Sequence, residues 1–161
     1  MHYRIQCACT AFGKLRTRVF EDRGLRTKTK MLVYRTVVLP TLLYASETWT
    51  TYRHHIKTLE KFHQRCMRKI LKINWQDHRT NDSVLEEVDC SSIEGLIIKN
   101  QLRWAGHVTR MNETSVPKQI FYSELSEGIK KVGGQKKCYK DCLKESLNVC
   151  DIDCTTWGKE A

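Results

Sequence analysis

Apolar residues recur at spacings of three and four along most of this 161-residue chain. The first such stripe consists of Ile5, Ala8, Cys9, Phe12, Leu15 and Val19. This spacing places the side chains on one face of an α-helix, and no segment has the alternation typical of a half-buried strand. We therefore expect an all-α fold, in which a helical bundle is followed by a basic connector and short C-terminal helices.

Turn-forming and capping residues divide this pattern into separate helices. A turn at 21–25 precedes a second helix at about 28–39, which Thr27 or Thr29 would cap. This helix is apolar on more than one side, so we expect it to be the most buried element. Pro40 should kink or end it, because proline has no N–H to donate.

Later signals predict a loop at 75–81 and two further helices before residue 112. Asp82 or Ser83 would cap the first of these. Ser91 or Ser92 would cap the second, which extends to Met111, and Ser91 with Glu94 fits a capping box. A final helix is expected at about 135–149.

Three regions are expected: a helical region at 1–111, a basic flexible connector at 112–135, and a short Cys-containing helical tail at 136–161. Gly128, Gly133 and Gly134 alternate with lysines in the connector. The first stripe begins almost at residue one with no capping sequence before it, which predicts that the chain is part of a longer one.

The strongest functional signal is a third amphipathic stretch, residues 53–72, which holds seven Lys and Arg against one acid, Glu60. Its inner face is expected to consist of Ile56, Leu59, Phe62 or His63, Cys66, Ile70 and, just beyond, Ile73. The candidate phosphate-binding residues are Lys57, Lys61, Arg65, Arg68, Lys69 and Lys72. A helix this basic faces phosphates, lies on a membrane surface, or is simply solvated.

The whole chain is also basic, with a formal charge of +10 and a pI near 9.3. Such a balance favours binding to a polyanion, nucleic acid first. The longest apolar run, residues 37–45, has only nine residues and contains Pro40, so we expect no membrane span. No signal peptide is apparent, so we expect an intracellular protein.

The eight cysteines are expected to be reduced thiols, because no export signal is present. Four of them could in principle supply tetrahedral thiolate ligands to Zn²⁺: Cys138, Cys142, Cys150 and Cys154. Their spacing does not match a common zinc knuckle, and Cys142 falls on an apolar stripe. We therefore expect no cofactor in this chain, and a small zinc protein remains a third interpretation.

Several unusual strings resemble one known family in the order in which they occur. They are Ala11-Phe12-Gly13-Lys14-Leu15, Lys28-Thr29-Lys30, Val33-Tyr34-Arg35, the run Leu39 to Trp49, Phe62 to Arg68, Ile73 to Asp77, Leu102 to Met111, and Tyr139-Lys140-Asp141. Over residues 5–145 the chain resembles the region that follows the palm in reverse transcriptases of non-LTR, LINE-like retrotransposons of the endonuclease–reverse transcriptase type.

This resemblance implies that the chain is polymerase-thumb-like, with a segment that follows the thumb. The parent protein would be an RNA-directed DNA polymerase with an endonuclease, would use Mg²⁺, and would act on chromosomal DNA in the nucleus. The implied partners are an RNA or DNA primer–template duplex and the upstream palm domain. Arg103 and Arg110, seven residues apart on one predicted helix face, are further candidates for phosphate contact.

The chain lacks the residues for the parent's chemistry. Two-metal nucleotidyl transfer needs closely placed carboxylates, and no Asp-Asp pair occurs in this sequence. We expect the chain alone to be catalytically inert. The rival interpretation is an inactive retroelement remnant, or a helical interaction domain without nucleic-acid activity.

Other chemistry-bearing residues have an ordinary structural explanation. His63 and His107 fall on inner or boundary positions, where core histidines are expected. Trp49, Trp75 and Trp104 would anchor helix packing, or would stack on bases if they are exposed beside Arg.

Overall fold

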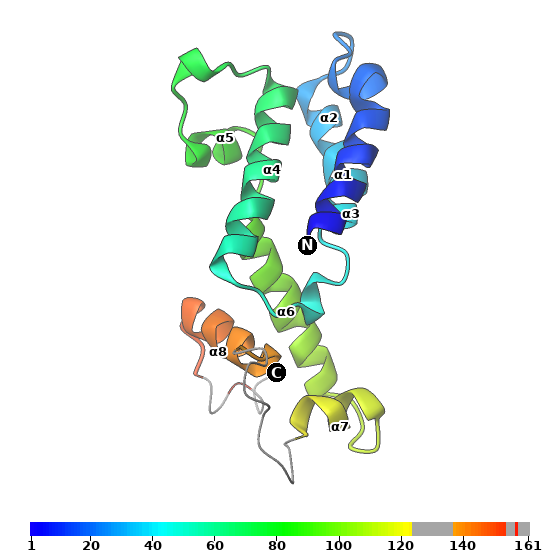
Figure 1. The fold of residues 1–161 in the computed structure, drawn as a ribbon, viewed down its shortest axis with the longest axis vertical. Coiled ribbons are helices and arrows are strands. Elements are labelled where there is room, and N and C mark those ends of the chain that lie inside the picture. The colour runs from blue at the N-terminus through cyan, green and yellow to red at the C-terminus, as the bar shows by residue number, and fades with distance from the viewer. Residues whose placement is uncertain (124–136, 154–156, 158–161) are drawn as a thin grey trace. The chain divides into compact units, whose positions relative to one another are not determined.

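The computed structural model describes residues 1–123, 137–153 and 157, and every regular element among them is helical. The all-α prediction is therefore confirmed. Among the described residues, no helix is both long and apolar enough to cross a bilayer. The chain divides into two compact units: unit 1 contains residues 1–45 and 52–96, and unit 2 contains residues 46–51 and 97–161. The helices are labelled in Figure 1.

Unit 1 begins with α1, His2–Leu15, which continues as a wider π-turn over Arg16–Phe20. Its buried face carries Ala8 and Phe12, as the apolar stripe predicted. The rings of Phe12 and Phe20 stack with centroids 4.4 Å apart, so the apolar face of α1 continues through the π-turn. This contact fixes the end of α1 before the turn at residues 21–25.

The second helical segment continues past Pro40. It consists of α2, Thr27–Val33, a π-turn at Tyr34–Val38, and α3, Leu39–Leu42. The Leu39 N–H donates to the Tyr34 carbonyl, five residues back, so the turn is already widened before Pro40. A wider turn accommodates the proline ring and its missing N–H, and the helix therefore does not end there.

Two details of this segment differ from the sequence prediction. The residue before the helix is Arg26, which makes no side-chain capping bond, and Thr27 is already helical, so neither threonine is the cap. The segment is buried on one side only: Tyr34, Val38 and Leu42 are inaccessible, whereas Leu32 and Val37 are 61% and 42% exposed. It is therefore less buried than its apolar composition predicted.

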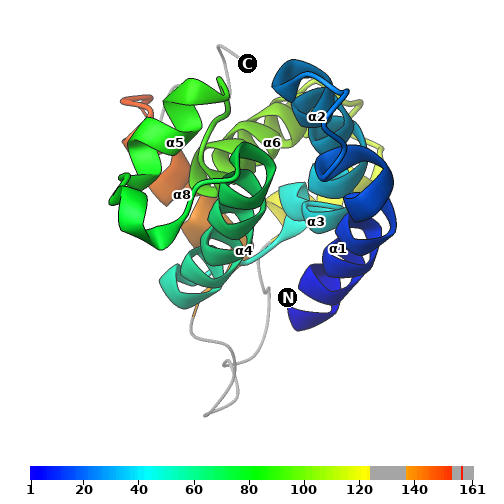
Figure 2. The same cartoon turned by 90° about the horizontal axis from the view of Figure 1, so that it is seen from above.

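Helix α4, Arg53–Leu71, packs against α1, α2 and α5 within unit 1 (Figure 2). After it come a short 3₁₀ turn at Trp75–Asp77, then α5, Asn81–Glu87, and α6, Ile93–Thr109. Thr80 caps α5, because its hydroxyl accepts the Ser83 N–H at 3.2 Å. The predicted caps Asp82 and Ser83 lie inside that helix.

The start of α6 is capped by Ser92, one of the two predicted caps, whose hydroxyl accepts the Gly95 N–H at 3.2 Å. The predicted capping box of Ser91 with Glu94 does not form, because the Glu94 carboxylate pairs with Arg53 instead. The boundary between the two units falls within α6, after Leu96.

Unit 2 is built from the later part of α6 with α7, Val116–Tyr122, and α8, Tyr139–Val149. Its hydrophobic core is small and consists of Ala105, Val108, Phe121, Leu143 and Leu147. Helix α7 lies inside the predicted connector, whose residues 124–135 are outside the described part of the chain. The predicted division at residues 111 and 135 stays a prediction.

Side-chain hydrogen bonds in unit 2 join the segment Ser46–Thr51 to α6 and α8. Gln101, almost completely buried, donates from Nε2 to the Trp49 carbonyl at 3.0 Å and accepts from the Ser146 hydroxyl at 3.0 Å. Asn100 donates to the Ser46 hydroxyl at 2.9 Å. The segment Ser46–Thr51 is therefore held to α6 by polar side chains rather than by apolar packing alone.

Candidate nucleic-acid interface

Helix α4 has the strongly two-sided character that its sequence predicted. Its buried residues are Leu59, Phe62, His63, Gln64, Cys66, Met67 and Ile70. The helix ends at Lys72, which adopts the left-handed conformation with φ 59°, and its N–H returns to the carbonyls of Arg68 and Lys69. The apolar face is anchored in unit 1, and the opposite face is therefore presented to solvent.

Four cations follow one another at intervals of four residues on this outer face: Lys57, Lys61, Arg65 and Lys69. All four are exposed, and so is Lys72 at the end of the helix. We call these five residues the basic row. At 1.5 Å per residue the four helical members span about 18 Å along the axis, roughly half a turn of duplex.

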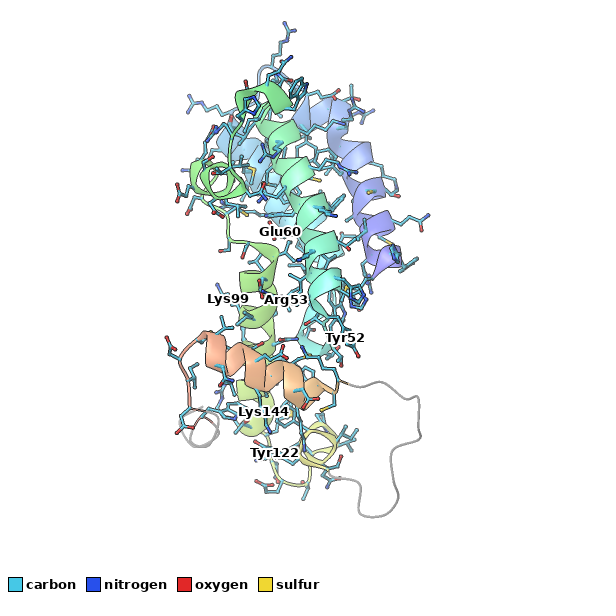
Figure 3. All side chains as sticks on the ribbon, turned by 60° about the vertical axis from the view of Figure 1, so that its left-hand side comes forward. Tyr52, Arg53, Glu60, Lys99, Tyr122 and Lys144 are labelled. Atoms are coloured by element: carbon cyan, nitrogen blue, oxygen red, sulfur yellow. The ribbon has the colours of Figure 1, made fainter. Side chains whose placement is uncertain are left out.

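The basic row is not neutralised within the described part of the chain. None of its members forms an ion pair there, whereas Arg53 pairs with Glu94 and Arg79 pairs with Glu87. Glu60, the one acid of α4, is occupied elsewhere, as its Oε2 accepts the Ile93 N–H at 2.8 Å and its Oε1 accepts from Gln64 at 3.1 Å (Figure 3). The surface potential of this face is therefore positive.

Arg68 has a different place from the other predicted phosphate ligands. It is half-buried, and its Nη2 donates to the Arg79 carbonyl at 2.8 Å and to the Asn81 Oδ1 at 3.0 Å. These bonds tie the loop after α4 back onto the helix. The sequence grouped Arg68 with the exposed cations because helical spacing shows only on which face a residue lies, not what a distant loop offers it.

A surface hollow lies beside the basic row in unit 1. It is lined by Lys61, Gln64, Arg65, Arg68, Lys69, Ile73 and Asn81. Four cations around one hollow can bind an anion by charge and by N–H donation. The apolar parts of these long side chains also line the hollow, so its surface is both polar and apolar.

Beneath the basic row, a buried polar cluster supports α4. His63 is inaccessible, its Nδ1 lies 2.9 Å from the Tyr34 hydroxyl, and its Nε2 lies 3.9 Å from the Cys90 sulfur. Burial lowers the pKa of His63, since the charged imidazolium would lose its hydration. Burial also raises the pKa of the Tyr34 hydroxyl well above its usual range. Both groups are therefore neutral and structural, as predicted for His63.

The second pair of predicted ligands, Arg103 and Arg110, belongs to unit 2. Arg103 lies on α6 and Arg110 in the turn directly after it, both are exposed, and they line one hollow together with Glu47, Asn100, Trp104 and His107. His107 is exposed here, so its predicted place in the core is wrong. His107 lies four residues after Arg103, on the same exposed face of α6. The sequence pattern of α6 did not distinguish this face from the apolar one.

The tryptophans have different roles. The Trp104 ring meets the Phe121 and Tyr139 rings edge to face, with centroids 5.9 and 5.6 Å apart, so it anchors helix packing in unit 2. Trp49 is partly buried and its carbonyl accepts from Gln101. Trp75 packs into no core and is 79% exposed.

The cysteines of the C-terminal tail are dispersed. Cys138 caps α8, Cys142 is buried and its sulfur lies 3.7 Å from the Thr51 carbonyl, and Cys150 is exposed at the other end of α8. Cys154 lies outside the described residues, so the four-cysteine arrangement stays a sequence hypothesis. Among the residues that the structure describes, no three His, Cys, Asp or Glu side chains are placed to hold a metal ion.

Comparison with known proteins gives one informative similarity. The chain is 28% identical over 119 residues to an uncharacterized transposon-derived protein of Caenorhabditis elegans. The match covers 70% of this chain and 41% of that relative, so the chain spans less than half of the relative's length. No protein-family profile matches the chain, and no solved structure matches it significantly. The similarity is thus to a protein of transposon origin.

Proposed function

We propose that this chain binds the sugar–phosphate backbone of a nucleic-acid duplex through the basic row of α4. The observation that carries the proposal is the set of four exposed cations on one face of an anchored helix, with Lys72 at its end, none of which forms an ion pair in the described part of the chain. Lys and Arg in such a row contact phosphates and position a duplex without reading its sequence.

The wider role that we propose is that of the thumb and post-thumb part of a retrotransposon RNA-directed DNA polymerase. The similarity to a transposon-derived protein supports this assignment, as do the family-like strings in α1, α4 and α6. The duplex would be the primer–template, and catalysis with Mg²⁺ would belong to the palm of the parent protein, which acts in the nucleus. Arg103 and Arg110 would supply additional phosphate contacts from unit 2.

Contact with the upstream palm is the second part of this assignment. It is supported by an apolar surface hollow in unit 1, lined by Cys7, Thr10, Ala11, Lys14, Leu15 and Val37. This surface contains no member of the basic row. A helical interaction domain without nucleic-acid activity would retain the hollow but would show no salt-dependent binding to a duplex.

The test is a triple charge reversal, Lys61→Glu, Arg65→Glu and Lys69→Glu, with affinity for a 20-base-pair RNA–DNA duplex measured over a range of salt concentrations. Losing three phosphate contacts should reduce the slope of log K against log salt by about 3. The matched control reverses Lys14, Arg18 and Lys28, which are exposed in the same unit and change the net charge equally.

The proposal requires that the control retains most of the binding and of the salt slope. Equal losses in both triple variants would mean that only net charge matters. An unchanged slope after reversal of the basic row would mean that α4 does not contact the phosphates.

A further inference from the structure

Trp75 is the most exposed large apolar side chain among the described residues, at 79%. Indole is usually buried at least in part, because its large apolar surface is costly to hydrate. The His78 ring meets it at 88° with centroids 6.3 Å apart, and covers only a small part of it. A flat π-surface is therefore open to a ligand.

Hydrogen bonds within a short turn, rather than core packing, fix the backbone that carries this ring. Trp75 begins the 3₁₀ turn Trp75–Asp77, in which the Asn74 side chain accepts the Asp77 N–H and the Asp77 carboxylate accepts the Asn74 N–H at 2.7 Å. The Asp77 carboxylate is thus occupied within the turn. Because the backbone is already ordered, binding through Trp75 costs mainly the side-chain entropy of Trp75 itself.

The loop that carries Trp75 begins at the end of the basic row. It starts at Lys72, the last member of the row, and Arg68 ties its far end to α4 through Arg79 and Asn81. Ile73, which precedes Trp75 in the loop, and Asn81, which follows it, line the same hollow as Lys61 and Arg65. The exposed ring therefore lies in the loop that borders the proposed phosphate-binding surface.

We propose that Trp75 stacks on an unpaired nucleobase at the end of the duplex that the basic row holds. This inference rests on the proposed function. Bases inside a duplex are covered on both faces by their neighbours, so only a terminal or unpaired base offers a free face to an indole. Stacking of this kind tolerates any base, since every base has a π-face.

The experiment compares a blunt duplex with the same duplex carrying a five-nucleotide overhang, 5′ or 3′, for the wild type, Trp75→Ala and Trp75→Phe. We expect Trp75→Ala to lower affinity for one of the overhang substrates by roughly tenfold. Affinity for the blunt duplex and the salt slope should stay unchanged, because no phosphate contact is lost. Trp75→Phe should retain most of the overhang preference.

The control is Tyr3→Ala, which removes another exposed aromatic side chain of unit 1, 70% exposed, far from the basic row in sequence. It should change neither affinity. Circular dichroism of each variant checks that the fold is retained, and the Phe variant preserves the test if the Ala variant is damaged.

Each result decides the matter. If Trp75→Ala binds both substrates like the wild type, or loses both equally, stacking on an unpaired base is wrong. In that case the proposed function would still stand, provided that the triple charge reversal of the basic row abolishes binding to the blunt duplex. If the wild type binds neither substrate, the proposed function fails and the stacking site fails with it. A wild-type preference for overhangs that Trp75→Phe retains and Trp75→Ala loses supports the site.

Discussion

The Tyr34 hydroxyl and the His63 imidazole meet at 2.9 Å in the interior of unit 1. This contact joins α4 to the π-turn before Pro40, 29 residues earlier in the chain. Neither partner is accessible to solvent. The contact therefore holds the basic helix in a fixed orientation, and it makes the stability of unit 1 sensitive to the protonation of one buried group.

Acid should destabilise unit 1 through His63. Burial holds its folded-state pKa below the unfolded value of about 6.5, so below that pH the unfolded chain binds the extra proton and the folded chain does not. The free energy of unfolding should be unaffected above about pH 6.5 and should fall as pH decreases, by at most about 1.4 kcal/mol per pH unit for one histidine. The nearby Glu60 carboxylate opposes the shift but does not reverse it.

Urea unfolding at several pH values measures this dependence, and His63→Gln should flatten it. His55, whose pKa is also lowered by burial and by His54, should leave a smaller residual slope that His55→Gln removes. A pH dependence that is identical in the wild type and His63→Gln would contradict the prediction.

Replacing Gln101 with Ala should destabilise unit 2 by about 1–3 kcal/mol, because the partly buried Trp49 carbonyl and the buried Ser146 hydroxyl would both lose their partner. Chemical denaturation followed by tryptophan fluorescence measures the change. Gln119→Ala, an exposed change in the same unit, should stay within about 0.5 kcal/mol of the wild type. Equal effects of the two substitutions would show that the Gln101 bonds add no stability.

Substitutions of Arg68 and Arg65 should have different effects, the first on stability and the second on duplex binding. Arg68→Ala removes the donors to Arg79 and Asn81, so amide hydrogen exchange in residues 73–81 should accelerate and stability should fall by about 1–2 kcal/mol. Arg65→Ala removes an exposed side chain with no ion pair in the described part, and should leave exchange unchanged while reducing the salt slope of duplex binding by about 1. If Arg65→Ala accelerated exchange and Arg68→Ala changed only the salt slope, the assignment of the two residues would be wrong.

Cys66 should resist alkylation in the folded protein. Burial raises the pKa of its thiol to about 12, so at pH 8 only about one molecule in 10,000 carries the reactive thiolate. Mass spectrometry after timed iodoacetamide treatment should show Cys9 and Cys150, both exposed, modified at least about 100-fold faster. In urea the rates should converge. Rapid labelling of Cys66 without denaturant would show that the α4 core opens readily.

Periodicity predicted the helices best where one face is apolar and the other charged. The inner and outer faces of α4 follow its sequence closely, since burying Leu59, Phe62 and Ile70 requires that Lys57 and Lys61 point away. The same reasoning failed for His107, because α6 has a less sharply divided sequence and its boundary positions do not identify which side faces the core.

Caps and helix ends were less predictable because several residues compete for the same role. Asp82, Ser83 and Thr80 are all good N-cap residues, and the bond that forms is the one from the Ser83 N–H to the Thr80 hydroxyl. Pro40 ends many helices, yet the preceding π-turn accommodates it here. That turn depends on the packing of Tyr34 and Val38, which a local signal does not contain.

The sequence by itself determined the all-α class, the amphipathic α4 and the excess of positive charge, because these depend on residue type and on spacing within one helix. Only the tertiary structure decided that Arg68 ties down a loop, that Gln101 bonds to Trp49 and Ser146, and that Trp75 stays exposed while Trp104 is packed. Each of these depends on which distant backbone or ring lies opposite a side chain. Such contacts between residues far apart in the chain leave no periodic signal in the sequence.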